Sequence, residues 1–165
     1  LLDLLGGYGY DARVLPFRAV KNFPKFLRHG AYFLKMLGKG RRIDMFFAQD
    51  PVSVGVPCGF AALVLKKKFI IKIVGDYAWE QAVQRFGVDD MLDEFIRKKY
   101  GFRVEFLKKC ERWSAQKAAH VIVPSAYLKR VVEQWGIDAA KISVIPNSFD
   151  PPSFSVEKSE ARKGA

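Results

Sequence analysis

Five short runs rich in Val, Ile and Phe alternate with longer segments of helical composition, and this alternation constrains the fold more than any other feature. The runs span Ala12–Phe17, Ile43–Gln49, Phe69–Val74, Val121–Val123 and Ile142–Ile145. Most are apolar on both faces, and the segments between them are long enough for crossover helices. The pattern predicts an α/β fold with a Rossmann-like, doubly wound parallel sheet that helices cover on each side.

Helix signals occupy the intervening segments. We expect helices over Asn22–Leu37, at about Val56–Lys67, over Met91–His120 with a break at Gly101, and over Ala126–Trp135, with a short one at Leu1–Leu5. A chain of 165 residues suits one ordinary α/β core rather than two. We therefore expect a single domain over residues 1–150, followed by a linker or exposed tail over residues 151–165.

The charge and the cysteines restrict the function classes. The chain has 28 Lys and Arg against 17 Asp and Glu, a net charge of +11, which favours an anionic partner such as phosphate, anionic lipid or nucleic acid. No apolar run approaches the roughly 20 residues of a membrane span. Cys58 and Cys110 lie far apart without metal-ligand spacing, so we expect no metal site, no disulfide and a cytoplasmic protein with reduced thiols.

Polar residues follow four of the five runs. Asp50 follows the second run, Gly75–Glu80 the third, Ser125 the fourth and Asn147 the fifth. In an open parallel sheet, ligands bind beyond the carboxyl ends of the strands, where loops and helix N-termini converge. The sequence therefore predicts a candidate site at this edge of the sheet.

Two segments carry a family resemblance. One runs from Asp44 to Glu80. The other contains His120–Ser125, a helix, Gly136 and then the stretch Lys141–Asp150. Both resemble the N-terminal domain of the family 4 glycosyltransferases, retaining enzymes of the two-domain GT-B fold. Gly9–Leu15 is similar to the turn and second strand that follow the family's first helix, so the first strand and its Gly-rich loop would be missing.

The resemblance implies transfer of a sugar from a nucleotide-sugar donor to a glycan, a glycolipid or a lipid-linked saccharide acceptor. The donor would bind through a missing C-terminal domain with the family's Glu-x7-Glu site, so we expect this part to be inactive alone. Transfer in the family resembles a front-face displacement that needs no protein nucleophile and no cofactor. Its largest catalytic contribution would be electrostatic stabilisation of the departing diphosphate.

Asp76 is the candidate catalytic residue. A carboxylate just past a buried strand, next to flexible Gly75, can accept a hydrogen bond from a sugar hydroxyl and orient it for attack. In many members of the resembled family a histidine occupies about this place, and here the residue is Asp. The alternative is that Asp76 caps a following helix.

The candidate substrate-binding residues surround Asp76 at the same edge. Tyr77 and Trp79 offer flat faces on which sugar rings stack, and Glu80 offers a carboxylate for their hydroxyls. The alternative for Trp79 is that it fills space above the sheet. The remaining candidates are Asp50, Gly75 and Ser125. Ser125 is better explained as the cap of the helix that begins near Ala126.

The segment from Asn22 to Lys39 carries the clearest amphipathic signal. One face would hold Lys21, Lys25, Arg28, Tyr32, Lys35 and Lys39, and the other Phe23, Phe26, Leu27, Phe33, Leu34 and Leu37. Such a helix can lie on an anionic leaflet, gaining roughly 1 kcal/mol per basic residue near the surface. The membrane-surface candidates are Lys25, Arg28, Lys35 and Lys39, at the inner face of the plasma membrane. The alternative is a helix that covers the sheet and leaves its lysines solvated.

Two charged groups suggest ordinary helix roles. Asp89, Asp90, Asp93 and Glu94 could suggest a divalent metal, but their spacing predicts an N-cap followed by acids in the first helical turn. The basic residues Arg97, Lys98, Lys99, Lys108 and Lys109 are expected on a solvated helix face.

Two rival functions stay open from the sequence. The main one is a non-catalytic basic module that binds anionic lipid or, less favoured, nucleic acid through the region from Phe17 to Arg42, with steep salt dependence. The other is a nucleotide-binding Rossmann enzyme that uses Asp50 and Asp76. The chain has no Gly-x-Gly-x-x-Gly or Gly-x4-Gly-Lys-Ser/Thr loop, which counts against the second rival.

Overall fold

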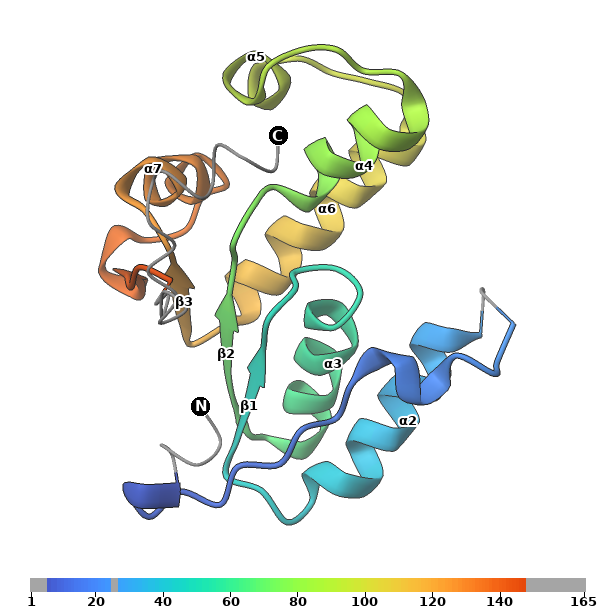
Figure 1. Ribbon diagram of the computed structural model, residues 1–165, viewed down its shortest axis with the longest axis vertical. Coiled ribbons are helices and arrows are strands. Elements are labelled where there is room, and N and C mark those ends of the chain that lie inside the picture. Colours follow the sequence, from blue (N-terminus) through green and yellow to red (C-terminus); the bar gives the residue numbers. More distant parts are fainter. Residues whose placement is uncertain (1–5, 25–26, 148–165) are drawn as a thin grey trace, which may run out of the picture.

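The computed structural model describes residues 6–24 and 27–147 and has an α/β fold built on a four-stranded, all-parallel sheet (Figure 1). The strands are β1 (Met45–Ala48), β2 (Lys68–Lys72), β3 (His120–Val123) and β4 (Ile142–Val144). They lie side by side in chain order. Each connection is therefore a crossover to the neighbouring strand, which confirms the predicted Rossmann-like parallel sheet for four of the five runs.

Helices precede β1 and fill the connections between the strands. Their bounds are η1 (Phe17–Val20), α2 (Arg28–Gly40), α3 (Gly55–Leu65), α4 (Tyr77–Phe86), α5 (Leu92–Arg97), α6 (Phe102–Lys117), α7 (Ala126–Gln134) and η2 (Ala139–Lys141). The break expected at Gly101 is confirmed, because this residue separates α5 from α6. The helix expected after Ser125 is confirmed as α7. The short helix expected at residues 1–5 lies outside the described residues.

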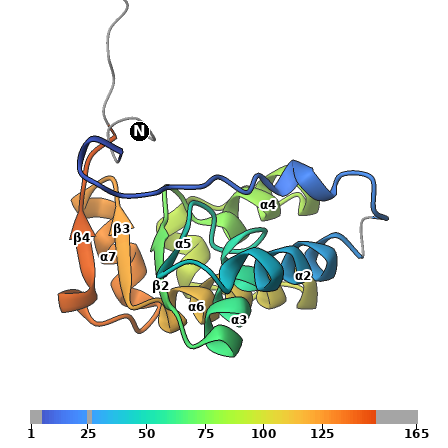
Figure 2. The ribbon, with the colours of Figure 1, turned by 90° about the horizontal axis from the view of Figure 1, so that it is seen from below.

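The prediction of a strand at Ala12–Phe17 is wrong. Residues 12–16 have no regular structure and lead into η1. Figure 2 shows this N-terminal segment (blue) running along the outside of the molecule, from the side of β4 toward α2. The carbonyl of Leu15 accepts a hydrogen bond from the Tyr32 hydroxyl of α2. Leu15 and Phe17 pack against the core. The segment is therefore held by side-chain packing and one side-chain hydrogen bond, and not by the backbone hydrogen bonds to a neighbouring strand that define a sheet.

The structure corrects both the start and the buried face of α2. The helix begins at Arg28, not at Asn22, and buries Tyr32, Met36 and Gly40. Tyr32 was expected on the polar face, whereas Leu34, expected on the apolar face, is 65% exposed. A Cβ on Gly40 would lie 2.4 Å from the Phe46 ring. The close approach of helix and strand at this glycine therefore selects which stripe of α2 faces the core.

In the described part of the chain, two hydrophobic clusters make up the interior. The larger one joins the strands to α2, α3 and α7, and its fully buried members include Ala48, Ile71 and Val121. The smaller one consists of Ala78, Ala82, Phe95 and Val104, from α4, α5 and α6. The smaller cluster therefore fixes α4, the helix that follows the candidate catalytic residue.

Candidate functional site

The loops that follow β1, β2 and β3 meet at one edge of the sheet. The Ser53 hydroxyl lies 3.4 Å from the hydroxyl of Tyr77, which joins the loop after β1 to the start of α4. The Tyr127 hydroxyl of α7 donates to Asp93 at 3.1 Å, which joins the helix after β3 to α5. The structure thus brings Asp50, Gly75–Glu80 and Ser125 to the same edge, where the carboxyl ends of the strands lie (Figure 1).

Asp50 organises the loop that leads into α3. Its Oδ1 accepts hydrogen bonds from the backbone N–H groups of Val52 at 2.9 Å, of Ser53, and of Val54 at 3.1 Å. Its own carbonyl accepts from the N–H of Gly55 at 2.8 Å. Three backbone donors on one carboxylate oxygen fix this turn and the position of Ser53 at the edge.

Asp76 is buried and caps α4. Its side chain is only 3% exposed, and its Oδ1 accepts from the N–H of Trp79 at 2.8 Å. This is the capping geometry that the sequence left as an alternative. Beside it, a Cβ on Gly75 would lie 2.4 Å from Glu80 Oε1. The glycine therefore leaves room for the exposed Glu80 carboxylate to fold back toward the end of β2.

A second carboxyl, Glu111 of α6, reaches the same helix start, and the sequence analysis missed it. Glu111 is fully buried, and its Oε2 accepts from the N–H of Ala78 at 3.1 Å. Burial raises the pKa of Asp76, and burial together with the charge of Asp76 raises the pKa of Glu111 well above its ordinary value. Of the two carboxyls, Glu111 is the one whose pKa lies well above its ordinary value, so it keeps its proton to the higher pH.

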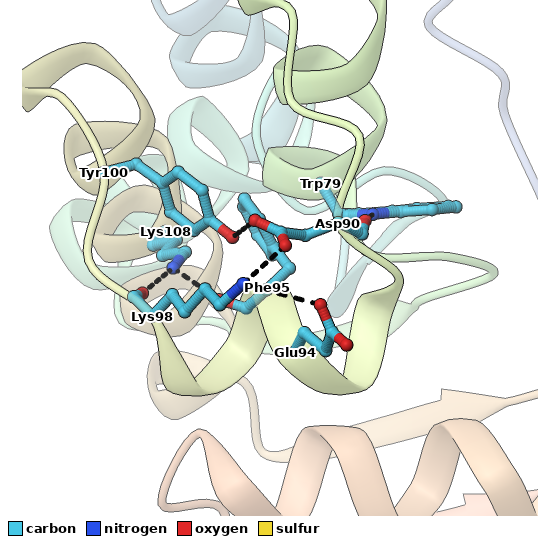
Figure 3. A network of polar contacts seen from close by, with 7 residues as sticks. All are labelled: Trp79, Asp90, Glu94, Phe95, Lys98, Tyr100 and Lys108. Carbon is cyan, nitrogen blue, oxygen red and sulfur yellow. Dashed lines mark hydrogen bonds and ion pairs between the residues drawn. The ribbon is translucent and has the colours of Figure 1, made fainter.

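Lys108 is buried, and the prediction of a solvated position is wrong for this residue. Its Nζ donates to the carbonyls of Phe95 and Lys98, each at 2.9 Å, and lies 4.0 Å from the centroid of the Phe95 ring. Glu105 lies 3.4 Å from the same nitrogen. Figure 3 shows Lys108 pointing from α6 toward the turn after α5. Carbonyl, carboxylate and aromatic partners together compensate the loss of water around the ammonium.

Trp79 and Asp90 connect α4 to this turn (Figure 3). The Trp79 indole donates to the carbonyl of Asp90 at 2.9 Å, and its ring packs against the smaller cluster. This contact matches the space-filling alternative for Trp79. Asp90 does not cap α5, because its carboxylate oxygens lie 2.6 Å from Lys98 Nζ and 2.6 Å from the Tyr100 hydroxyl. The hydrogen bond from Lys98 has the larger effect, and together with the bond from Tyr100 it lowers the pKa of Asp90 to about 2.

Ser125 caps α7, as predicted, by accepting from the N–H of Leu128 at 3.2 Å. Asp93 and Glu94 occupy the first turn of α5, also as predicted. At the edge itself, Glu80, Ser125 and Tyr127 are exposed, and Tyr77 is partly exposed. Tyr127 was missed by the sequence analysis because its place depends on how α7 packs.

The basic residues of α2 are partly engaged by the protein. The Arg28 guanidinium donates to the carbonyls of Lys21 and Phe23, both at 2.9 Å, and Lys35 Nζ donates to the carbonyl of Ala19 at 2.8 Å. Lys39 is exposed, and Lys25 lies outside the described residues. Within the described part of the chain, no helix has the length and apolar character needed to cross a bilayer. The same residues include no cluster of three or more metal-binding side chains.

Comparison with protein families gives one finding. A model described as Glycosyltransferase Family 4 matches residues 4–152. The matched range includes every residue that the structure brings to the carboxyl edge. Comparison with curated proteins gives no match.

Proposed function

The chain belongs to glycosyltransferase family 4, and from this premise we propose that it forms the acceptor side of the cleft in a retaining enzyme. The enzyme transfers a sugar, a hexose in this proposal, from a nucleotide-sugar donor to a glycan, a glycolipid or a lipid-linked saccharide. Residues 1–150 form the N-terminal domain, and residues 151–165 lead to a C-terminal domain that binds the donor. In this proposal the N-terminal domain alone does not turn over.

The observation that carries the proposal is the convergence of three loops at the carboxyl edge. The 3.4 Å contact between Ser53 and Tyr77 and the 3.1 Å hydrogen bond between Tyr127 and Asp93 hold the loops after β1, β2 and β3 together. Ligands of open parallel sheets bind at such an edge. The exposed groups there are hydroxyls, aromatic faces and a carboxylate, which is the chemistry that binds a saccharide.

Each edge residue has a role in this proposal. Glu80 accepts a hydrogen bond from an acceptor hydroxyl, and the face of Tyr77 supports the sugar ring. Gly75 lets the Glu80 carboxylate lie close to the strand end, while Asp50 and Ser125 hold the neighbouring loop and helix. A direct catalytic role of Asp76 stays a prediction. Its capping of α4 supports at least a positioning role, because α4 carries both acceptor contacts.

The proposed reaction is a front-face displacement. The acceptor oxygen bonds to the anomeric carbon on the face from which the diphosphate departs, and the hydroxyl proton passes to the departing diphosphate. This domain contributes by orienting the acceptor hydroxyl, which removes entropy from the barrier. Stabilisation of the diphosphate charge falls to the donor domain.

The α2 region belongs to the same proposal as a membrane contact for a lipid-linked acceptor. Exposed Lys39 and the positive charges of Arg28 and Lys35 lie on a helix whose Tyr32 and Met36 pack inward. Packing against α3 and contact with anionic headgroups are compatible, because Lys35 and Lys39 stay exposed beside the stripe of α2 that buries Tyr32 and Met36.

Turnover of nucleotide sugars by the full-length protein tests the proposal. We expect Glu80→Gln and Asp76→Ala each to lower kcat by about tenfold or more, since positioned polar groups typically contribute about 10²-fold. Asp138→Ala is the matched control. Asp138 also caps a helix, η2, but this helix lies before the amino end of β4, at the opposite edge of the sheet. Unchanged turnover in Asp76→Ala removes Asp76 from the mechanism. Absence of sugar transfer with any nucleotide sugar contradicts the proposed activity.

A further inference from the structure

Between α4 and α6 lies an open groove of about 250 Å³. Its lining includes Gln81, Arg85, Phe86, Phe102, Arg103 and Phe106. Phe102 is 81% exposed and Phe106 is 62% exposed. The two phenyl rings are four residues apart on α6, so they project from the same side of the helix. Large exposed rings gathered in one place mark an interaction surface.

The charged side chains that line the groove have one sign. Arg85 and Arg103 line the groove, and no acidic side chain lines it among the described residues. The Arg103 guanidinium lies 5.9 Å from the centroid of the Phe102 ring, so cation and ring are presented together. Aromatic rings interleaved with guanidinium groups match the boundary of an anionic bilayer, where acyl chains lie directly beneath phosphate headgroups.

A second patch of the same composition favours an extended surface over a small partner. Phe23, Leu27 and Leu34 are exposed around α2, and the sequence has no acidic residue from Phe17 to Arg42. Both views place the start of α2 and the first turn of α6 toward the same side of the molecule (Figures 1 and 2). A membrane can contact two separate patches on one side at once.

We propose that the α4–α6 groove docks this domain on an anionic phospholipid bilayer. Phe102 and Phe106 enter the boundary between headgroups and acyl chains, and Arg85 and Arg103 pair with lipid phosphates. The α2 patch touches the same surface. Docking in this way holds the carboxyl edge near the membrane, because Tyr77 both lines the groove and lies at that edge. The inference does not depend on turnover, so it can fail or stand independently of the proposed activity.

Co-sedimentation of the full chain with vesicles tests the inference. The wild-type chain is expected to pellet with equimolar phosphatidylcholine and phosphatidylglycerol, and to stay in the supernatant with phosphatidylcholine alone. Binding should weaken as salt is added. Arg85→Glu with Arg103→Glu should weaken partitioning by roughly 30-fold or more, given about 1 kcal/mol per basic residue. Phe102→Ser with Phe106→Ser should weaken it by about tenfold or more.

Matched controls separate the groove from the general basicity of the chain. Lys117→Glu with Lys141→Glu makes the same change in net charge at the far end of α6 and in η2. Leu63→Ser with Val64→Ser removes exposed apolar side chains from α3. All the substituted side chains are exposed, so circular dichroism should show each variant folded. Controls that pellet like the wild type support the inference.

Three outcomes overturn the inference. The first is a groove variant that pellets with the anionic vesicles as fully as the wild type. The second is equal loss of binding in groove variants and controls, which would assign the binding to net charge. The third is a wild-type chain that stays in the supernatant, which would leave a protein as the occupant of the groove.

Discussion

Replacing Glu111 with Gln removes the buried titrating group that α6 places against the start of α4. Burial and the charge of Asp76 raise the pKa of Glu111 well above its ordinary value of 4.5. The folded state therefore binds the Glu111 proton more tightly than the unfolded state. The stability that Glu111 contributes is fully present below the unfolded pKa and is lost as the pH rises through the folded pKa.

The expected magnitude follows from linkage. In the range above pH 4.5 where Glu111 is still protonated in the folded chain, one proton changes the free energy of unfolding by about 1.4 kcal/mol per pH unit. Glu111→Gln keeps an oxygen that can accept from the N–H of Ala78 and has no proton to lose. The variant should therefore gain stability relative to the wild type as the pH rises. The free energy of unfolding of Glu111→Leu should change with pH in the same way as that of Glu111→Gln. It should be about 1–3 kcal/mol lower at every pH, because Leu leaves the Ala78 N–H unpaired.

Urea unfolding followed by circular dichroism, at a series of pH values from 4.5 to neutral, measures these differences. The difference between Glu111→Gln and the wild type should widen with pH, and the Gln and Leu variants should stay parallel. If the wild type and Glu111→Gln keep a constant difference across the series, Glu111 is ionised in the folded chain without cost. A raised pKa of Glu111 at the start of α4 would then be refuted.

Two further predictions concern packing. Gly40→Ala should destabilise the fold by about 1–3 kcal/mol, because the new Cβ would lie 2.4 Å from the Phe46 ring. Gly38→Ala meets nothing within 4 Å and should stabilise α2 by about 0.5–1 kcal/mol. Thermal unfolding of the two variants measures both changes, and equal shifts in melting temperature would contradict the packing of α2. Trp79→Phe should cost about 1 kcal/mol in urea unfolding, since the indole loses its 2.9 Å hydrogen bond to the carbonyl of Asp90, and an unchanged midpoint would show that this bond contributes nothing.

Local signals in the sequence determined much of the architecture. Four apolar runs became the parallel strands because each carries enough β-branched and aromatic side chains to be buried in a sheet. Gly101 separates α5 from α6, and Ser125 caps α7, as predicted. Helix caps and helix breaks depend on hydrogen bonds between residues a few positions apart, so the local sequence predicts them.

The edge of the sheet that carries the candidate site also followed from the sequence. Parallel strands end at a common edge, so the loop of Asp50, the turn at Gly75 and the cap Ser125 had to gather there once the strands were known. The family match over residues 4–152 agrees with the resemblance carried by the same segments. What each side chain does at that edge did not follow from strand order.

Only the tertiary structure decided which groups are buried and what they bond. Tyr32 and Lys108 looked solvated by their spacing. Tyr32 instead packs against the Phe17 ring and donates to the Leu15 carbonyl, and Lys108 finds its carbonyl partners in α5 and the turn after it. Glu111 gave no signal at all, because its partner Ala78 lies 33 residues away. Periodicity reports which side chains share a face, but the cost of burying a charge depends on partners that only folding brings within reach.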